Sequence, residues 1–564
     1  MSKQMKEIQF PSASYDQWKE EATKALKGKP FESLFTKTQE DITLSPLYTQ
    51  EMLVEKLGDQ LENQISTIRS LKEAEGFNVA QQIFGGTTEQ FFANLQDSVD
   101  KGNNYITIDS RTAFEWDNES LAKLANILTT TPFKLIVQND NDPILAVFNQ
   151  IEEKQNIKGF IISEKQFTLN GFENVRTFCA NSATYHYEGA NAVQELAITL
   201  ALASKFANES SFEEVSKKFF VNFAIDTQFF AEIAKLRAFK VLWKAFAAAF
   251  GVDNPQAIPV LAENSLRSYS KLDVYVNLLR AGNEAFAGVI GGADVITVHP
   301  HDVLSKPTDQ SIRIARNVLL VLKEESRVAE VLDPSGGSYF IETLTAEYVE
   351  KAWDLFNQIE EAGGFDAYAS AGTLQADLEE VYNARLQAVE TRKESLIGTN
   401  IYANPVDELP TETNPILSDV KRLAVPFEQL REQFKLAQAK IGVLTYGKLK
   451  DFKPRADFVA GFFATAGNIP EQSGELLTVE SATQWLQNAN YDYVIVAAKD
   501  DDAKELVPAL LSNKPENVIL DVAGKFKEEQ DEWQQSGLNG FIFAGQNIVK
   551  KLNEVLESVK GVQQ

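Results

Sequence analysis

Short apolar segments alternate with longer amphipathic segments along most of this chain. Residues that are apolar in runs of four or five predict strands at 105–109, 133–137, 159–162, 175–178, 258–261, 295–298 and 328–332. Segments with a helical period lie between them, at 121–128, 142–153, 190–206, 229–250 and 310–325. This repeated strand-then-helix order predicts an α/β fold with a parallel sheet, and the number of repeats favours a closed (β/α)8 barrel of the TIM type.

The pattern changes at both ends of this region, which we place at residues 51–400. Residues 1–50 form an N-terminal arm, partly helical (15–27) and partly extended, with too little core to stand alone, so we expect it to contact another subunit. Residues 401–438 are a linker with four prolines and a charged helix over 428–440. Residues 439–564 alternate again, with strands at 441–445, 493–497, 518–522 and 541–543, which predicts a flavodoxin-like doubly wound α/β domain.

Charge and cysteine content narrow the function. Eighty acidic residues against 54 basic ones give a net charge of −26, which disfavours nucleic acid and anionic membranes as partners. The single cysteine, Cys179, excludes an internal disulfide and any multi-cysteine metal site, so we expect a cytoplasmic protein. No signal peptide or membrane-spanning run is apparent in the sequence.

Two histidines occupy positions where barrel enzymes place catalytic groups, the carboxyl ends of strands. His186 is expected to follow a strand over 175–185, and His299 follows the strand at 295–298. A histidine at a strand end is more often a satisfied structural residue, so both interpretations stay open. His299 and His301 alone do not make a metal site, because no third ligand lies nearby in the sequence.

Two further motifs have structural interpretations. The Asp333–Tyr339 loop (DPSGGSY) contains paired glycines that could cradle a phosphate, but we expect its helix only after Thr345, which favours a structural turn. Glu232, Lys235 and Arg237 are interpreted as surface or interhelix ion pairs.

Several long strings resemble the methylmalonyl-CoA mutase family. They are FFAEIAKLRA at 229–238 with Leu242-Trp243, PTDQSIRIARN at 307–317 with EES at 324–326, DPSGGSY at 333–339, and PLYT at 46–49. The resemblance implies an acyl-CoA-binding barrel followed by a cobalamin-binding domain. It also implies interconversion of (R)-methylmalonyl-CoA and succinyl-CoA by radical chemistry on adenosylcobalamin.

The C-terminal domain departs from the family's cofactor motifs. The family's Asp-x-His-x-x-Gly loop, whose histidine is the lower axial cobalt ligand, falls on Leu449, Asp451 and Pro454, and no histidine follows His301. The Ser-x-Leu element falls on Ala497 and Lys499, and the Gly-Gly pair falls on Ala523 and Gly524. We therefore expect a degenerate domain that binds no cobalamin, since a carboxylate does not replace an oriented imidazole.

The predicted barrel also departs from the family's substrate-binding motifs. Tyr185-His186 is similar to the family's pair beside the substrate thioester, and His299 matches another family histidine. However, the substrate-lining stretch becomes Leu261–Ser265, in which the Glu263 carboxylate would repel an anionic acyl-CoA. The segment at 68–77 lacks the family's tyrosine, and between Leu169 and Tyr185 only Arg176 is present in place of the substrate-binding arginine. We therefore interpret His186 and His299 as vestigial.

This pattern resembles the small, non-catalytic subunit of the heterodimeric enzymes in the family. The resemblance implies an isomerase complex of propionate metabolism in which a large catalytic subunit binds adenosylcobalamin. This chain then has no catalytic, cofactor-binding or metal-binding residues of its own and stabilises its partner. Three alternatives remain: a CoA-binding module without catalysis, a module that docks chaperones, and a mutase for another acyl-CoA.

Overall fold

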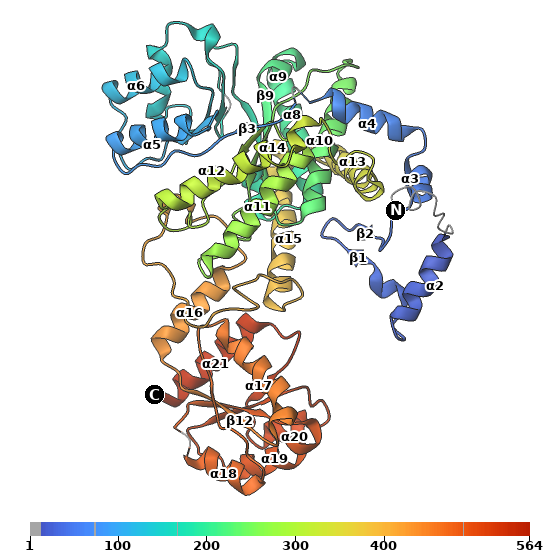
Figure 1. Ribbon diagram of the computed structural model, residues 1–564, viewed down its shortest axis with the longest axis vertical. Helices are drawn as coiled ribbons and strands as arrows, with labels where there is room; N and C mark the ends of the chain where they lie inside the picture. The colour runs from blue at the N-terminus through green and yellow to red at the C-terminus, as the bar shows by residue number, and fades with distance from the viewer. Residues whose placement is uncertain (1–12, 73–74, 166, 489, 564) are drawn as a thin grey trace, which may run out of the picture.

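The computed structural model describes residues 13–72, 75–165, 167–488 and 490–563 (Figure 1). The fold is mixed α/β with parallel sheets, as predicted. One sheet has the order β3-β11-β10-β9-β8, with β3 at Asn78–Val79, β11 at Val295–Thr297, β10 at Val260–Asn264, β9 at Phe219–Ile225 and β8 at Phe178–Asn181. A second has the order β4-β5-β6-β7, with β4 at Ile106–Asp109, β5 at Phe133–Ile136, β6 at Gly159–Ile162 and β7 at Val175–Arg176.

The two sheets adjoin at both of their ends. An isolated parallel bridge joins Gln82, just after β3, to Thr107 in β4. At the other end, only Thr177 separates β7 from β8, so one stretch of chain pairs with β6 and then with β9.

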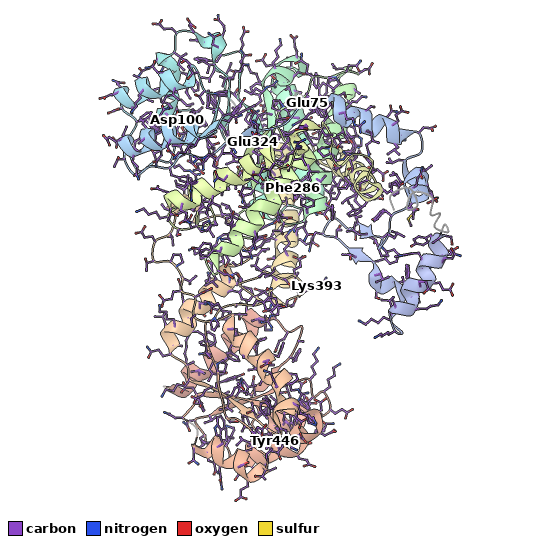
Figure 2. The ribbon with its side chains drawn as sticks, viewed as in Figure 1. Glu75, Asp100, Phe286, Glu324, Lys393 and Tyr446 are labelled. Carbon is purple, nitrogen blue, oxygen red and sulfur yellow. The ribbon has the colours of Figure 1, made fainter. Side chains whose placement is uncertain are left out.

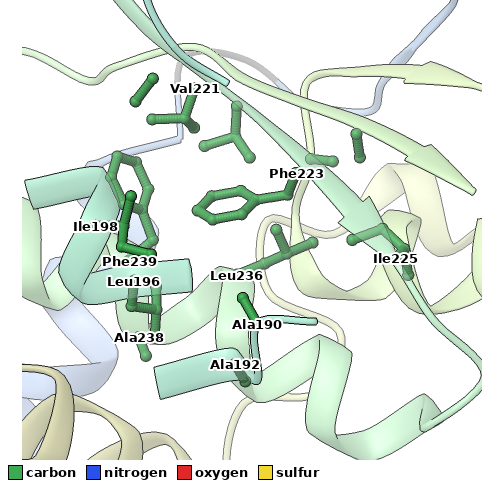
Figure 3. Packing of buried hydrophobic residues seen from close by; sticks show 14 of the residues in the cluster. Ala190, Ala192, Leu196, Ile198, Val221, Phe223, Ile225, Leu236, Ala238 and Phe239 are labelled. Carbon is green, nitrogen blue, oxygen red and sulfur yellow. The ribbon is translucent and has the colours of Figure 1, made fainter. Parts of the chain in front are cut away.

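Burial on both faces explains why the central strands are apolar along most of their length. All seven residues of β9 (FFVNFAI) are buried, as is typical of a parallel strand that is covered on both sides. On its outer side, Phe223 packs against Phe239 of helix α10 (Phe229–Ala249), with ring centroids 5.7 Å apart (Figure 3). Helices α8 (Ala192–Glu209), α11 (Val274–Gly291) and α13 (Tyr339–Glu361) contribute to the same core.

The remaining helices before the linker are short connectors or outer layers. Their bounds are α3 (Gln50–Leu57), α4 (Gln60–Ser70), α5 (Thr88–Asp100), α6 (Asn118–Leu128), α7 (Ser182–Glu188), α9 (Phe212–Lys218), α12 (Asp309–Glu324), α14 (Phe365–Ser370) and α15 (Thr373–Glu390). Gly189 ends α7 with φ +128°, and an added Cβ there would lie 2.3 Å from the Leu378 carbonyl oxygen of α15. Only glycine therefore permits this close approach of α15.

Several predicted elements differ from the structure in type or in extent. The strand expected at 328–332 is a 3₁₀ turn (Val328–Glu330), because its apolar residues are largely exposed and have no sheet to join. The helix expected at 142–153 is also 3₁₀ (Pro143–Gln150). Helix α13 begins at Tyr339 and not after Thr345, since the Ser338 hydroxyl caps it by accepting from the Ile341 amide. The strand expected over 175–185 ends at Asn181, so His186 lies in α7.

The C-terminal part holds a third sheet with the order β13-β12-β14-β15-β16, all parallel. Its strands are β12 (Ile441–Thr445), β13 (Glu471–Gln472), β14 (Tyr493–Ala497), β15 (Ile519–Ala523) and β16 (Gly540–Ile542). Its helices are α17 (Leu449–Ala464), α18 (Val479–Asn488), α19 (Asp500–Asn513), α20 (Gln530–Gln535) and α21 (Ile548–Gln563). The linker contains a 3₁₀ turn (Pro415–Leu417) and helix α16, which spans Val425–Ala437 and not 428–440 because Gln438 adopts a left-handed conformation.

The N-terminal arm extends away from the sheets (Figure 1). The predicted helix is present as α2 (Tyr15–Ala25), followed by a 3₁₀ turn (Phe31–Leu34) and a hairpin of β1 (Thr36–Lys37) and β2 (Thr43–Leu44). No residue of α2 is buried, and residues 1–12 of the predicted arm lie outside the described residues. Among the described helices, none has the length and apolar character needed to cross a membrane.

Candidate functional site

The space enclosed by the two adjoining sheets is filled by side chains. We call its apolar part the interior layer: Ala80, Phe160, Ile162, Cys179, Phe220, Leu261 and Val295. The rings of Phe160 and Phe220 lie 5.0 Å apart, and Tyr105 stacks on Phe160 at 6.0 Å. Burial raises the pKa of the Cys179 thiol, so this side chain behaves as an apolar group in the layer.

A second set of inward side chains, the polar layer, consists of Lys134, Asn181, Asn222 and Glu263. The Lys134 ammonium donates to Asn222 Oδ1 at 3.2 Å and to Glu263 Oε2 at 3.1 Å. Asn222 Nδ2 donates in turn to Asn181 Oδ1 at 2.9 Å. Burial raises the pKa of Glu263, but Lys134 and then His299 outweigh it and hold the pKa below its ordinary value. Glu263 is therefore charged, and Lys134 already compensates that charge.

His186 lies in a buried network beyond the strand ends. Its Nδ1 is 2.8 Å from Glu195 Oε1 and its Nε2 is 2.8 Å from Ser265 Oγ. Arg267 donates to the His186 carbonyl oxygen at 3.1 Å. Burial and then the charge of Arg267 lower the pKa of His186 to about 4, so the imidazole is neutral at pH 7.

The order Glu195, His186, Ser265 is that of an acid–histidine–serine triad, but the environment does not permit the chemistry. His186 and Ser265 have no exposed surface, so no substrate carbonyl can approach the Ser265 hydroxyl. A histidine with a pKa of about 4 is also a weak general base at neutral pH. Lys235, 3.0 Å from Glu195, further ties the carboxylate into the core. This network is suited to structural support.

His299 is not part of this network. Its Nε2 lies 4.0 Å from Glu263 Oε1, and its Nδ1 has no hydrogen-bond partner among the described residues. His301 stacks near Tyr275, with ring centroids 5.2 Å apart. Across the described part of the chain, no group of three or more His, Cys, Asp and Glu side chains could hold a metal ion.

The residues interpreted as surface or interhelix pairs are buried, which corrects the surface alternative. Lys235 bridges Glu195 and Glu232, at 3.0 and 2.6 Å. Arg237 pairs with Asp333 and, at 2.5 Å, with Glu342. In the 333–339 loop, the Gly337 amide donates to Glu342 at 2.9 Å. An internal carboxylate thus already uses the amide that a phosphate would need, as a structural turn requires.

The cobalamin-motif positions cluster at the carboxyl ends of β12, β14 and β15. Leu449 begins α17, and Asp451 and Pro454 lie within this helix, so no extended loop is present. Lys499, just after Ala497 and β14, pairs with Asp451 at 2.7 Å. These residues therefore close the strand ends with a helix and an ion pair.

Neighbouring side chains occupy the space next to Ala523 and Gly524, where the family has its Gly-Gly pair. Ala523 ends β15, and Gly524 has φ +137°. An added Cβ at Gly524 would lie 2.8 Å from Phe526 and 3.3 Å from Arg455. Arg455 also pairs with Asp500 and donates to the Ala498 carbonyl oxygen.

The sequence predictions missed three charged residues that organise these sites. Lys134 lies inside the strand predicted at 133–137, and a lysine in a buried parallel strand is a usable signal because lysine is almost never buried unpaired. Asp226 and Arg267 form a buried pair at 2.5 Å. Neither carries a sequence signal, since the two residues lie on different loops.

Comparisons with known proteins identify relatives of this sequence. The methylmalonyl-CoA mutase small subunit of Porphyromonas gingivalis is 29% identical over 96% of this chain and 97% of that protein. The small subunits of Streptomyces virginiae and Propionibacterium freudenreichii are each 28% identical over 68% of this chain, and the matches cover 65% and 63% of those proteins. The family described as methylmalonyl-CoA mutase matches residues 137–438, more than half of the sequence. The chain therefore belongs to the methylmalonyl-CoA mutase family.

Proposed function

We propose that this chain is the structural small subunit of a methylmalonyl-CoA mutase. The complex interconverts (R)-methylmalonyl-CoA and succinyl-CoA, and a large subunit carries the active site and adenosylcobalamin. This chain stabilises the large subunit and performs no catalysis itself. The relatives named as small subunits support the assignment, and a cytoplasmic location remains our expectation.

Within this proposal, residues 51–400 form a (β/α)8 barrel and residues 439–564 form a degenerate cobalamin-binding-type domain. The Gln82–Thr107 bridge and the one-residue gap at Thr177 support closure of the two sheets into one ring. The C-terminal sheet has the order 2-1-3-4-5 when its strands are numbered along the chain, which is the flavodoxin-like order.

The filled barrel interior is the observation that carries the proposal. An acyl-CoA that passed through the barrel would have to displace the stacked rings of Phe160 and Phe220 and separate Lys134 from Glu263. Displacing close-packed aromatic side chains and breaking a buried ion pair each destabilise the fold by several kcal/mol. A CoA-binding function, with or without catalysis, is therefore disfavoured.

The C-terminal residues do not fit a cobalamin either. The cobalt ligand position lies within α17, and no histidine is present after His301. Phe526 and Arg455 fill the approach to Gly524. We accordingly place the cofactor on the partner and derive no step through it on this chain.

The N-terminal arm is the element we assign to the partner. Its aromatic side chains contact one another in a row, Tyr15 to Trp18, Trp18 to Phe31 and Phe31 to Phe35, at centroid distances of 5.5, 6.0 and 5.7 Å. Aromatic residues are enriched at protein interfaces, and no residue of α2 is buried against this chain. Phe31 is buried within the arm, whereas Tyr15 and Trp18 are partly exposed and Phe35 is exposed, so the arm offers these three rings to a second subunit.

The test is adenosylcobalamin binding by the full chain, followed by its visible spectrum, and then reconstitution with the large subunit of the same organism. We expect no binding by this chain, no change in its melting temperature with CoA, and mutase activity only after the subunits are combined. Tight binding of adenosylcobalamin by this chain would refute the proposal. Failure of the two subunits to co-purify would refute it as well.

A further inference from the structure

A cavity of about 820 Å³ lies beside the barrel, between the β1–β2 hairpin and helices α8, α10, α13 and α15. This volume is within the range of small-molecule sites. Phe229, Phe340 and Leu344 supply an apolar wall. Arg385 of α15 supplies a charged wall on another side. Figure 2 places Lys393, which also lines the cavity, at the end of α15.

Arg385 is a buried cation without a direct partner. The residue is only 9% exposed, and its Nε has no hydrogen-bond partner within the described ranges. No hydrogen bond or ion pair joins its two terminal nitrogens to any described residue. Burial, and next the charge of Arg267, lower the pKa of Arg385, whereas Asp226, Glu40 and Glu394 act in the opposite direction. An arginine in this position is costly to the fold unless an anion joins it.

The buried acids of the wall are already engaged elsewhere. Asp226 accepts two hydrogen bonds from Arg267, at 2.5 and 3.0 Å. Glu195 is bonded to His186 and Lys235, and Glu232 pairs with Lys235 at 2.6 Å. Among the deeply buried charges of the wall, Arg385 is therefore the one without a direct partner. The other carboxylates that line the cavity, Glu40, Asp41 and Glu394, are half-buried or exposed.

The hairpin forms one side of this space. Asn191 Nδ2 donates to the Gln39 carbonyl oxygen, and the Ala192 amide donates to Glu40 Oε1, both at 3.2 Å. Thr36 and Lys37 of β1 are exposed, and Figure 1 shows the hairpin beside α15. Ile42, between β1 and β2, is buried in the main hydrophobic core, and Leu44 of β2 packs against that core, so the hairpin holds this side of the cavity in place.

We propose that this cavity binds a small amphipathic organic anion. Its carboxylate or phosphate pairs with the Arg385 guanidinium, and its apolar part lies against Phe229, Phe340 and Leu344. The planar guanidinium suits either anion because it donates two parallel hydrogen bonds to paired oxygens. The inference does not depend on the proposed function, since it uses neither the partner subunit nor the barrel interior.

The test uses calorimetric titration of the full chain with three six-carbon probes: hexanoate, hexyl phosphate and hexanol. We expect one or both anions to bind the wild type and hexanol not to bind. Comparison of hexanoate with hexyl phosphate distinguishes a carboxylate ligand from a phosphate ligand. Arg385→Gln should weaken anion binding by roughly tenfold or more, because a charged hydrogen-bond pair is lost.

Two further variants keep the result interpretable. Arg313→Gln removes the same charge from an exposed position of α12, outside the cavity, and should leave anion binding unchanged. Arg385→Lys keeps the positive charge but not the planar guanidinium, so it should bind the anion more weakly than the wild type. It replaces Arg385→Gln in the titration if that variant does not fold. The proposal would be overturned if neither anion bound the wild type. It would also be overturned if the Arg385 variants bound the anions as tightly as the wild type does.

Discussion

The ammonium of Lys134 lies 3.1 Å from the carboxylate of Glu263, although the two residues are 129 positions apart and belong to different sheets. Under the proposed function, the pair occupies the interior through which an acyl-CoA would have to pass. The sequence alone suggested that Glu263 excludes acyl-CoA by repulsion. The geometry instead favours exclusion by occupancy, because Lys134 compensates the charge and the pair fills the space.

Removal of one member of this pair should destabilise the fold. Lys134→Met leaves Glu263 with an uncompensated charge, and we expect the free energy of unfolding to fall by about 3 kcal/mol or more. The measurement is urea unfolding at pH 7. The double variant Lys134→Met/Glu263→Leu should recover most of the loss, since it removes both charges. A single variant as stable as the wild type would show that the pair contributes nothing.

His186 should make the stability fall on mild acidification. Its pKa is about 4 in the folded chain and about 6.5 when unfolded, so only the unfolded chain takes up this proton between those values. The contribution of His186 to the free energy of unfolding is complete above pH 6.5. It is lost as the pH falls towards 4, and the total loss is about 3 kcal/mol.

The diagnostic quantity is the difference in unfolding free energy between the wild type and His186→Gln, measured from pH 7.5 to 4.5. Glu232, whose pKa burial raises to about 7, acts in the opposite direction but is present in both proteins. The difference should shrink as the pH falls. A difference that is independent of pH would mean that His186 is protonated as readily in the folded chain as in the unfolded chain.

Arg237 should be among the residues that tolerate substitution least. Arg237→Met leaves Asp333 and Glu342 buried without their cation and should lower the free energy of unfolding by about 3–5 kcal/mol. Thermal unfolding monitored by circular dichroism measures the effect. The exposed Arg313→Gln should change stability by less than about 0.5 kcal/mol. Equal melting temperatures for both variants would contradict the structural role of Arg237.

Deletion of residues 1–28 should separate folding from partner binding. Because no residue of α2 is buried against this chain, we expect the melting temperature to change little. Under the proposed function, affinity for the large subunit should fall sharply, which pull-down from a co-expressed pair would measure. The matched control replaces exposed Lys24 and Glu21 of α2 by glutamine and keeps the aromatic row. Undiminished co-purification after the deletion would exclude the arm from the interface.

Much of the fold was predictable because burial leaves a periodic trace. Strands β6 and β14 are buried throughout and coincide with the predicted ranges 159–162 and 493–497, and α2 begins at Tyr15 as predicted. Strand β9, although all seven of its residues are buried, was not predicted. The failures came where an apolar run has no neighbour to pair with, as at Val331, which is 54% exposed. For the candidate site, His186 and Glu263 were identified, but Lys134, Asp226, Arg267 and Arg385 were not.

The sequence by itself determined the α/β class, many of the strands and helices, the family resemblance and the absence of a histidine after His301, because these depend on residues that are close together in the chain or on their identity alone. Only the tertiary structure decided that Lys134 compensates Glu263, that His186 is neutral and buried, and that Arg385 faces a cavity without a partner. Charge compensation and desolvation depend on groups from distant segments, and their distances are fixed only when the sheets and helices pack together.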